Sequence, residues 1–198
     1  MDDRRGRWDR SVGGEARADG HRSAILGAAA RIRAASDGTL TVTDIVALAG
    51  VGRNTFYEHF EDADAVVAAL DEIAVRDLDH ALDAGASRAA TPIAQLRSVA
   101  SACLEYSRVH PESATSIFGG HVRSESRQST RRILASRLTA ILAGARAAGT
   151  VGRAVDDARL AAITGAYEAV AVRVAAETSA DVTRDVEALV DLTIRAFR

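Results

Sequence analysis

The densest group of chemically versatile side chains lies in the stretch VGRNTFYEHF, residues 51–60. It places three aromatic rings among four side chains that can donate hydrogen bonds: Phe56, Tyr57 and Phe60, and Arg53, Asn54, Thr55 and His59. A guanidinium or a carboxamide can form paired hydrogen bonds with the edge of a base, and hydroxyl and imidazole groups can bond to phosphate. The stretch therefore offers hydrogen bonding to bases and phosphates.

The residues that could support catalysis are less well placed. Cys103 and His110 form the only Cys–His pair at a suggestive spacing, and seven residues of helix separate them by about 10.5 Å. This distance is too long for a hydrogen bond between a nucleophile and its base. No His-x-x-x-His or Cys-x-x-Cys spacing occurs, and a two-ligand site from His110 and His121 is the one conceivable metal site. We expect no catalytic residue, no metal, no cofactor and no enzymatic activity.

Two short helices must position residues 51–60. Thr41 and Asp44 have the spacing of a capping box at the start of a helix over 41–50. We expect Ile45, Leu48 and Ala49 to form the inner face of this helix, which Gly50 ends in the left-handed conformation. A second helix of about seven residues follows directly, and this arrangement is typical of a helix-turn-helix.

Helical spacing divides the second helix into two faces. Phe56 and Phe60 are four residues apart, so they share a face, and we expect both in the core. The polar residues remain for contact with DNA, with Arg53 and Asn54 at the helix end that reaches base edges. Together with two threonines of the preceding helix, the predicted DNA-binding residues are Thr41, Thr43, Arg53, Asn54, Thr55, Tyr57 and His59.

The stretch TVTDIVALAGVGRNTFYEHF resembles the helix-turn-helix of the tetracycline-repressor (TetR) family. The family pattern is Thr-x-x-x-Ile-Ala-x-x-Ala-Gly-Val-x-x-x-Thr-x-Tyr-x-His-Phe. The matching positions are Thr41, Ile45, Ala49, Gly50, Val51, Thr55, Tyr57, His59 and Phe60. ILGAA at 25–29 is similar to the usual end of the preceding helix. The resemblance covers residues 21–70, and beyond them it extends only to the number, length and order of helices.

The chain departs from the family pattern at three positions. Val46 replaces an alanine, and Arg33 stands where an aromatic residue is common. The family often has a lysine that holds a phosphate three residues after the His-Phe pair, and here that residue is Ala63. Residues 21–60 hold four arginines and three acidic residues, so few phosphates are expected to be neutralised per subunit.

The whole chain reads as an all-α protein of about nine helices. We expect residues 1–20 to be a flexible arm, which is either a disordered tail or an arm that touches DNA. Residues 21–65 form the three-helix, helix-turn-helix DNA-binding domain. The resemblance implies that residues 66–198 form a helical domain for ligand binding and dimerisation.

The last two helices are the candidates for a homodimer interface. Apolar faces recur at helical spacing in both: Leu160, Ile163, Tyr167, Val170 and Val174, and then Val186, Leu189, Val190, Thr193 and Phe197. An ordinary amphipathic helix would give the same pattern. For an unidentified small-molecule effector, the candidate contacts are Cys103, Tyr106, Ser107, His110, Phe118 and Tyr167. Cys103, Tyr106, Ser107 and His110 share one face of a helix expected over 91–110, and this face is either a pocket wall or a polar stripe.

Composition agrees with a cytoplasmic protein. Of 198 residues 47% are apolar, yet no apolar run reaches the roughly 18 residues that cross a bilayer, and we expect no membrane partner. All 25 basic residues are arginine, and the net charge is −2. Any contact with nucleic acid must therefore be local.

Two functions remain. One is a ligand-responsive transcription regulator, a repressor that binds a palindromic operator in double-stranded DNA as a homodimer and is released by a small molecule. The alternative is a helical small-molecule sensor or enzyme whose helix-turn-helix does not bind DNA.

Overall fold

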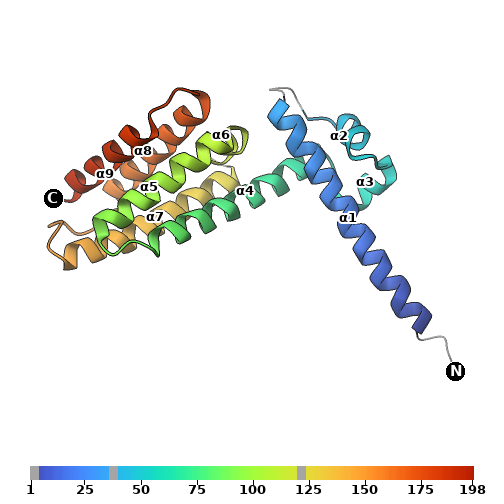
Figure 1. Ribbon diagram of the computed structural model, residues 1–198, viewed down its shortest axis with the longest axis horizontal. Helices are drawn as coiled ribbons and strands as arrows, with labels where there is room; N and C mark the ends of the chain where they lie inside the picture. Colours follow the sequence, from blue (N-terminus) through green and yellow to red (C-terminus); the bar gives the residue numbers. More distant parts are fainter. Residues whose placement is uncertain (1–4, 36–39, 120–123) are drawn as a thin grey trace. The chain divides into compact units, whose positions relative to one another are not determined.

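The computed structural model describes residues 5–35, 40–119 and 124–198, with side chains from residue 19 onward. Nine helices follow one another in the described residues, and Figure 1 shows their order along the chain. Their bounds are α1 Arg5–Ala35, α2 Val42–Ala49, α3 Arg53–His59, α4 Ala63–Ala86, α5 Pro92–Val109, α6 Pro111–Gly119, α7 Glu125–Ala147, α8 Asp157–Ala176 and α9 Val182–Phe197. The predicted all-α fold is confirmed.

The chain divides into two compact units, which meet within the sequence of α4. Unit 1 ends at Leu70 and unit 2 begins at Asp71, whereas the sequence predicted the border at residue 65. Helix α4 begins where Asp62 accepts a hydrogen bond from the backbone N–H of Ala65 at 2.8 Å. Asp62 is therefore the N-cap of α4.

The N-terminal segment differs from the expected flexible arm. Helix α1 begins at Arg5, and residues 1–4 lie outside the described residues. The segment before His21 has no helical repeat of apolar residues, so its sequence pattern does not indicate a helix. Extending an existing helix needs no new nucleus, and each added residue contributes a backbone hydrogen bond.

The core of unit 2 is aliphatic and is built from α5 to α9 together with the C-terminal part of α4. Helices α5, α8 and α9 lie side by side, and α6 packs on α8 (Figure 1). Leu78, Leu96, Leu134 and Phe197 are among its fully buried side chains. None of the helices in the described residues is long and apolar enough to cross a membrane.

Candidate nucleic-acid interface

Helices α2 and α3 are joined by a tight turn whose geometry follows from its sequence. Thr41 caps α2: its Oγ1 accepts a hydrogen bond from the Asp44 N–H at 3.2 Å and donates one to the Asp44 carboxylate at 2.5 Å. Gly50 ends the helix with φ 67°, a conformation that favours glycine. Helix α3 begins three residues later, at Arg53. The predicted helix-turn-helix is confirmed.

The inner face of α3 rests on two phenylalanines. Phe56 is fully buried and Phe60 nearly so, and their ring centroids are 6.0 Å apart. Ile45 of α2 and Ile25 and Ala29 of α1 are buried as well. The predicted core positions of Phe56 and Phe60 are confirmed.

Leu48 departs from the predicted inner face of α2. Its side chain is 42% exposed, whereas Ile45 on the same helix is fully buried. A helix of 8 residues has little more than two turns, so α1 and α3 cover only part of its surface. Ile45 fills that covered part, and Leu48 lies beyond it.

The predicted DNA-binding residues fall into two groups. The exposed ones are Thr41, Thr43, Arg53, Asn54 and Tyr57. Thr55 and His59 are half-buried. The Tyr57 side chain is 54% exposed, although its ring meets that of the buried Phe56 edge-on at 5.4 Å. The ring centroids of His59 and of His21 in α1 are 6.4 Å apart. The half-buried His59 side chain therefore faces α1 on one side and solvent on the other.

One contact within this set could not be predicted from helical spacing. The Nη2 of Arg53 donates a hydrogen bond of 2.7 Å to the hydroxyl of Thr43, ten residues earlier in the chain. The turn at Gly50 folds α3 back against α2, so the two side chains meet on the exposed surface. The Thr43 hydroxyl is neutral, so this hydrogen bond does not offset the positive charge of Arg53.

Several solved structures share this arrangement of helices. The fatty acid degradation regulator FadR from Bacillus halodurans matches with a TM-score of 0.71 at 18% identity, over 88% of this chain and 94% of that chain. The transcriptional regulator FadR from Bacillus subtilis, in complex with stearoyl-CoA, matches at 0.71 and 19% identity, over 89% and 99%. A TetR-like transcriptional regulator from Rhodococcus sp. RHA1 matches at 0.70 and 21% identity, over 88% and 94%. The chain has the TetR fold.

Sequence comparison adds nothing to this assignment. No protein-family model and no curated protein sequence matches the chain. The solved structures match almost nine-tenths of this chain in fold, at sequence identities of about one residue in five.

Unit 2 of the TetR fold contains all six predicted effector residues. Cys103, Ser107, Phe118 and Tyr167 are buried, Tyr106 is half-buried and His110 is exposed. The ring centroids of Tyr106 and His110 are 4.9 Å apart, and the Ser107 hydroxyl donates to the Cys103 carbonyl at 2.9 Å. The shared face on α5 thus runs from the core at Cys103 to the surface at His110.

Burial controls the protonation of the two titratable groups in this core. It raises the pKa of the Cys103 thiol to about 12, and the nearby Glu168 carboxylate adds to the shift. Burial also raises the pKa of the Tyr167 phenol. Both groups are neutral at pH 7, and a protonated thiol is not a nucleophile. The Thr193 side chain near the Tyr167 hydroxyl partly offsets the rise in the pKa of this phenol, although the hydroxyl makes no well-formed hydrogen bond within the described residues.

A buried carboxylate beside this core was not predicted from the sequence. Glu168 is only 4% exposed, and Arg127 of α7 pairs with its Oε2 at 3.1 Å. Arg131, one turn further along α7, approaches Oε1 at 3.5 Å. The spacing of Arg127 and Arg131 places them on one face of a helix, but nothing in the sequence indicates which carboxylate they meet. Within the described residues no group of three or more His, Cys, Asp or Glu side chains could hold a metal.

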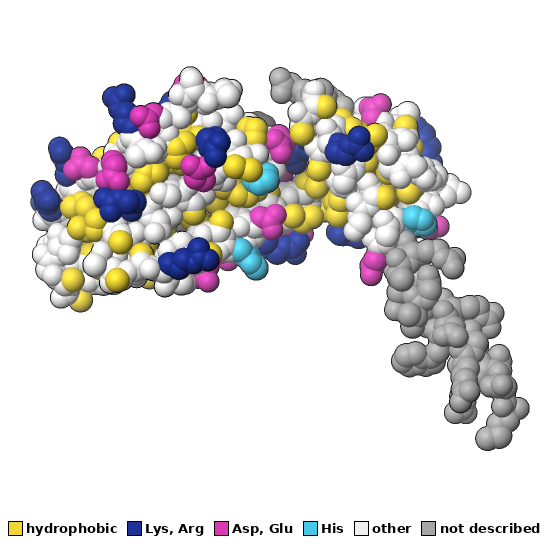
Figure 2. Space-filling model, viewed as in Figure 1, with side chains coloured by type: hydrophobic (Ala, Val, Ile, Leu, Met, Phe, Trp, Pro, Cys, Tyr) yellow, Lys and Arg dark blue, Asp and Glu magenta, His cyan; other side chains and the backbone are white. Residues whose placement is uncertain are grey.

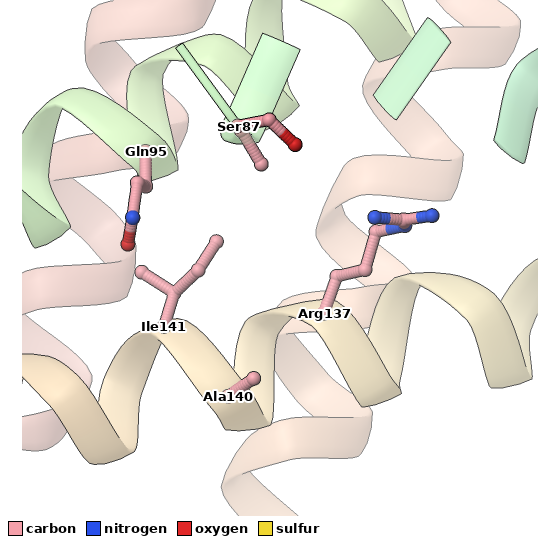
Figure 3. Close-up of a pocket in the computed structure, with 6 residues that line it drawn as sticks. Ser87, Gln95, Arg137, Ala140 and Ile141 are labelled. Carbon is pink, nitrogen blue, oxygen red and sulfur yellow. The ribbon is translucent and has the colours of Figure 1, made fainter. Parts of the chain in front are cut away.

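An open groove of about 350 Å³ lies on another part of unit 2. Figure 3 shows Arg137, Ala140 and Ile141 of α7 on one side of it and Ser87 and Gln95 on the other. Arg137 donates hydrogen bonds to two carboxylates of α4, from Nη1 to Asp83 at 3.0 Å and from Nε to Asp79 at 3.2 Å. None of the six predicted effector residues lines this groove.

The apolar faces predicted for a dimer interface belong to the core of unit 2. Ile163, Tyr167 and Val174 of α8 are buried, as are the five predicted residues of α9, while Leu160 and Val170 are half-buried. Periodicity identifies an apolar face but not its partner, and here α5 of the same chain packs on both helices and α6 packs on α8. The exposed residues of α8 include Ala158, Ala161, Ala162 and Ala169, whereas those of α9 are mostly charged, with Ala188 and Leu192 among them.

Charged side chains elsewhere on unit 2 are mixed in sign. Figure 2 shows arginines and acidic residues interspersed on the visible face, with apolar side chains between them. Several form ion pairs between helices, such as Arg97 of α5 with Glu187 of α9. Unit 2 therefore presents no strongly basic surface on this face.

Proposed function

We propose that this chain is a DNA-binding transcription regulator, a repressor that binds a palindromic operator as a homodimer and is released by a small molecule. The observation that carries the proposal is the division of α3, in which Phe56 is buried while Arg53, Asn54 and Tyr57 are exposed. The similar solved structures described as transcriptional regulators support it.

Each DNA-facing residue has a role in this proposal. Arg53 and Asn54, at the N-terminal end of α3, contact base edges. Thr41, Thr43, Thr55, Tyr57 and His59 hold phosphates or meet a thymine methyl group. Arg53 is the only arginine among these seven residues, so the salt dependence of binding is shallow, at roughly −0.9 per phosphate neutralised.

Dimerisation follows from the demands of specificity, because a single recognition helix contacts too few bases. The proposed interface is formed by the outward faces of α8 and α9, with exposed alanines on α8 and Leu192, which is 45% exposed, on α9. Small side chains allow helices of two subunits to approach closely, and four such helices would form a bundle.

The effector site of the proposal lies in unit 2. One similar structure, the FadR of Bacillus subtilis, is a complex with stearoyl-CoA, which supports response to a small molecule without identifying it here. Cys103, Tyr106, Ser107, His110, Phe118 and Tyr167 are the proposed contacts. An effector that binds one arrangement of the dimer more tightly shifts the population away from the DNA-binding arrangement.

A second function has a specific observation in its favour. The position of the family's phosphate-binding lysine is Ala63, and the neighbouring Asp62 serves as the cap of α4. A sensor or enzyme that no longer binds DNA would not need a basic residue there.

Selection of binding sites from random DNA duplexes distinguishes the two functions. We expect the full-length protein, at low salt and without effector, to enrich one palindromic sequence. The matched control is the double variant Arg53→Ala, Asn54→Ala, which changes two exposed residues and should fold normally but enrich nothing. If the unmodified protein enriches no palindrome, the regulator proposal is wrong and the alternative stands.

A further inference from the structure

The hydrogen bond to Thr43 holds the guanidinium of Arg53, a positively charged fork of N–H donors, on the exposed surface of the helix-turn-helix. Arg53 is the first residue of α3, and Thr43 is the second residue of α2. The 2.7 Å hydrogen bond uses one of the five N–H donors of the guanidinium. Four donors remain, and the neutral hydroxyl leaves the positive charge intact.

Holding the side chain in advance matters because arginine has many rotamers. An unrestrained arginine loses up to about 2 kcal/mol of side-chain entropy when it is fixed in a complex. The bond to Thr43 removes part of that loss before DNA is met. The Thr43 hydroxyl accepts from Arg53 and can still donate its own proton, so it can bond to a phosphate at the same time.

The chemistry of the fork selects one base. Guanine presents two acceptors, O6 and N7, on its major-groove edge, and these match two parallel N–H donors of a guanidinium. Adenine presents one acceptor beside an amino donor, which repels a second N–H. An arginine at the N-terminal end of a recognition helix is at the end that reaches base edges.

We infer that Arg53, positioned by Thr43, contacts one guanine in each half of the operator and thereby fixes the base at that position. Arg53 is the specificity-determining residue, and Thr43 is a positioning residue that acts through it. This inference rests on the proposed function, since it assumes that the chain binds DNA.

The test measures base preference at every position of the selected half-site. Binding of the full-length protein is measured to duplexes carrying each of the four base pairs in turn. We expect one position at which replacing guanine weakens binding by about ten- to a hundredfold. Arg53→Ala should bind all four duplexes at that position within about threefold of one another, and Arg53→Lys should lose most of the preference because it keeps the charge but not the fork.

Variants of Thr43 separate positioning from contact. Thr43→Val removes the acceptor while keeping the shape, and should reduce the guanine preference by about three- to tenfold, the value of one hydrogen bond. Thr43→Ser keeps the hydroxyl that accepts from Arg53 and should retain the guanine preference. Arg31→Ala is the matched charge control, since Arg31 is exposed on α1, and it should leave every base preference unchanged.

Two results would overturn the inference while leaving the proposed function intact. If Arg53→Ala weakens binding equally for all sequences and lowers the salt slope by about 0.9, Arg53 contacts a phosphate. If Thr43→Val keeps the full guanine preference, Thr43 does not position Arg53. Failure of the unmodified protein to select any sequence would refute the proposed function and the inference together.

Discussion

Phe56 and Tyr57 are neighbours in sequence, and the structure predicts opposite consequences for their replacement. Phe56 is fully buried, so Phe56→Ala should lower the free energy of unfolding of unit 1 by about 3–5 kcal/mol. Tyr57 is 54% exposed, and its ring makes an edge-to-face contact with the ring of Phe56. Such a contact contributes about 0.5–1.5 kcal/mol, which sets the expected cost of Tyr57→Ala.

Removing only the hydroxyl of Tyr57 isolates its role in DNA binding. Tyr57→Phe keeps the ring and its 5.4 Å contact with Phe56, so stability should change by less than about 0.5 kcal/mol. If the hydroxyl donates to a phosphate, the loss of one hydrogen bond to a charged group should weaken binding by about tenfold. Tyr57→Ala should weaken it at least as much.

Two measurements decide this prediction. Urea unfolding followed by circular dichroism gives the stability of each variant, and fluorescence anisotropy at a fixed salt concentration gives its affinity for the selected operator. The assignment of faces on α3 is refuted if Tyr57→Ala destabilises the protein as much as Phe56→Ala does. Wild-type affinity in Tyr57→Phe would show that the hydroxyl has no phosphate partner.

Four further perturbations test other parts of the molecule. Leu192→Asp places a charge on the outward face of α9 and should convert a dimer to a monomer, as measured by light scattering. An unchanged molar mass would show that this face is not the dimer interface. Tyr167→Phe removes a buried hydroxyl that makes no well-formed hydrogen bond within the described residues and should raise stability by about 1 kcal/mol, whereas a loss of stability would show that the hydroxyl bonds to the nearby Thr193. Cys103, with a pKa raised to about 12, should react with a thiol reagent at pH 8 only as fast as unit 2 unfolds, and rapid labelling would show an open path to the core. The hydrogen bond from Arg97 lowers the pKa of Glu187, so the stability that this pair adds is present above about pH 4.5 and is lost as the pH falls through the lowered value. Glu187→Gln should remove that part of the acid dependence, and an identical pH profile would contradict it.

Local rules were sufficient for the helix-turn-helix. The four-residue spacing of Phe56 and Phe60 predicted their burial, and the position of Gly50 predicted its positive φ. Both depend on residues close in sequence, where the geometry of a helix or a turn leaves few alternatives. The caps at Thr41 and Asp62 were predictable for the same reason.

Partners distant in sequence could not be predicted. The apolar faces of α8 and α9 were correctly identified as faces, but the sequence did not indicate that α5 and α6 of the same chain pack on them. Glu168 gave no sign in the sequence of its pairing with Arg127, because a buried carboxylate and an exposed one look alike there. The bond between Arg53 and Thr43 depends on how the turn folds α3 back on α2, which no periodicity describes.

The single buried residue of α3 also bears on how this protein could change over generations. Of its seven residues, only Phe56 is buried, and Arg53, Asn54, Tyr57 and Glu58 are exposed. Surface substitutions of this kind usually alter stability by less than about 0.5 kcal/mol. Mutations at Arg53, Asn54 and Glu58 can therefore accumulate at little cost, whereas replacing Tyr57 also removes its ring contact with Phe56. A duplicated copy of the gene could acquire a new target sequence by drift across these sites alone, while its scaffold stayed the same.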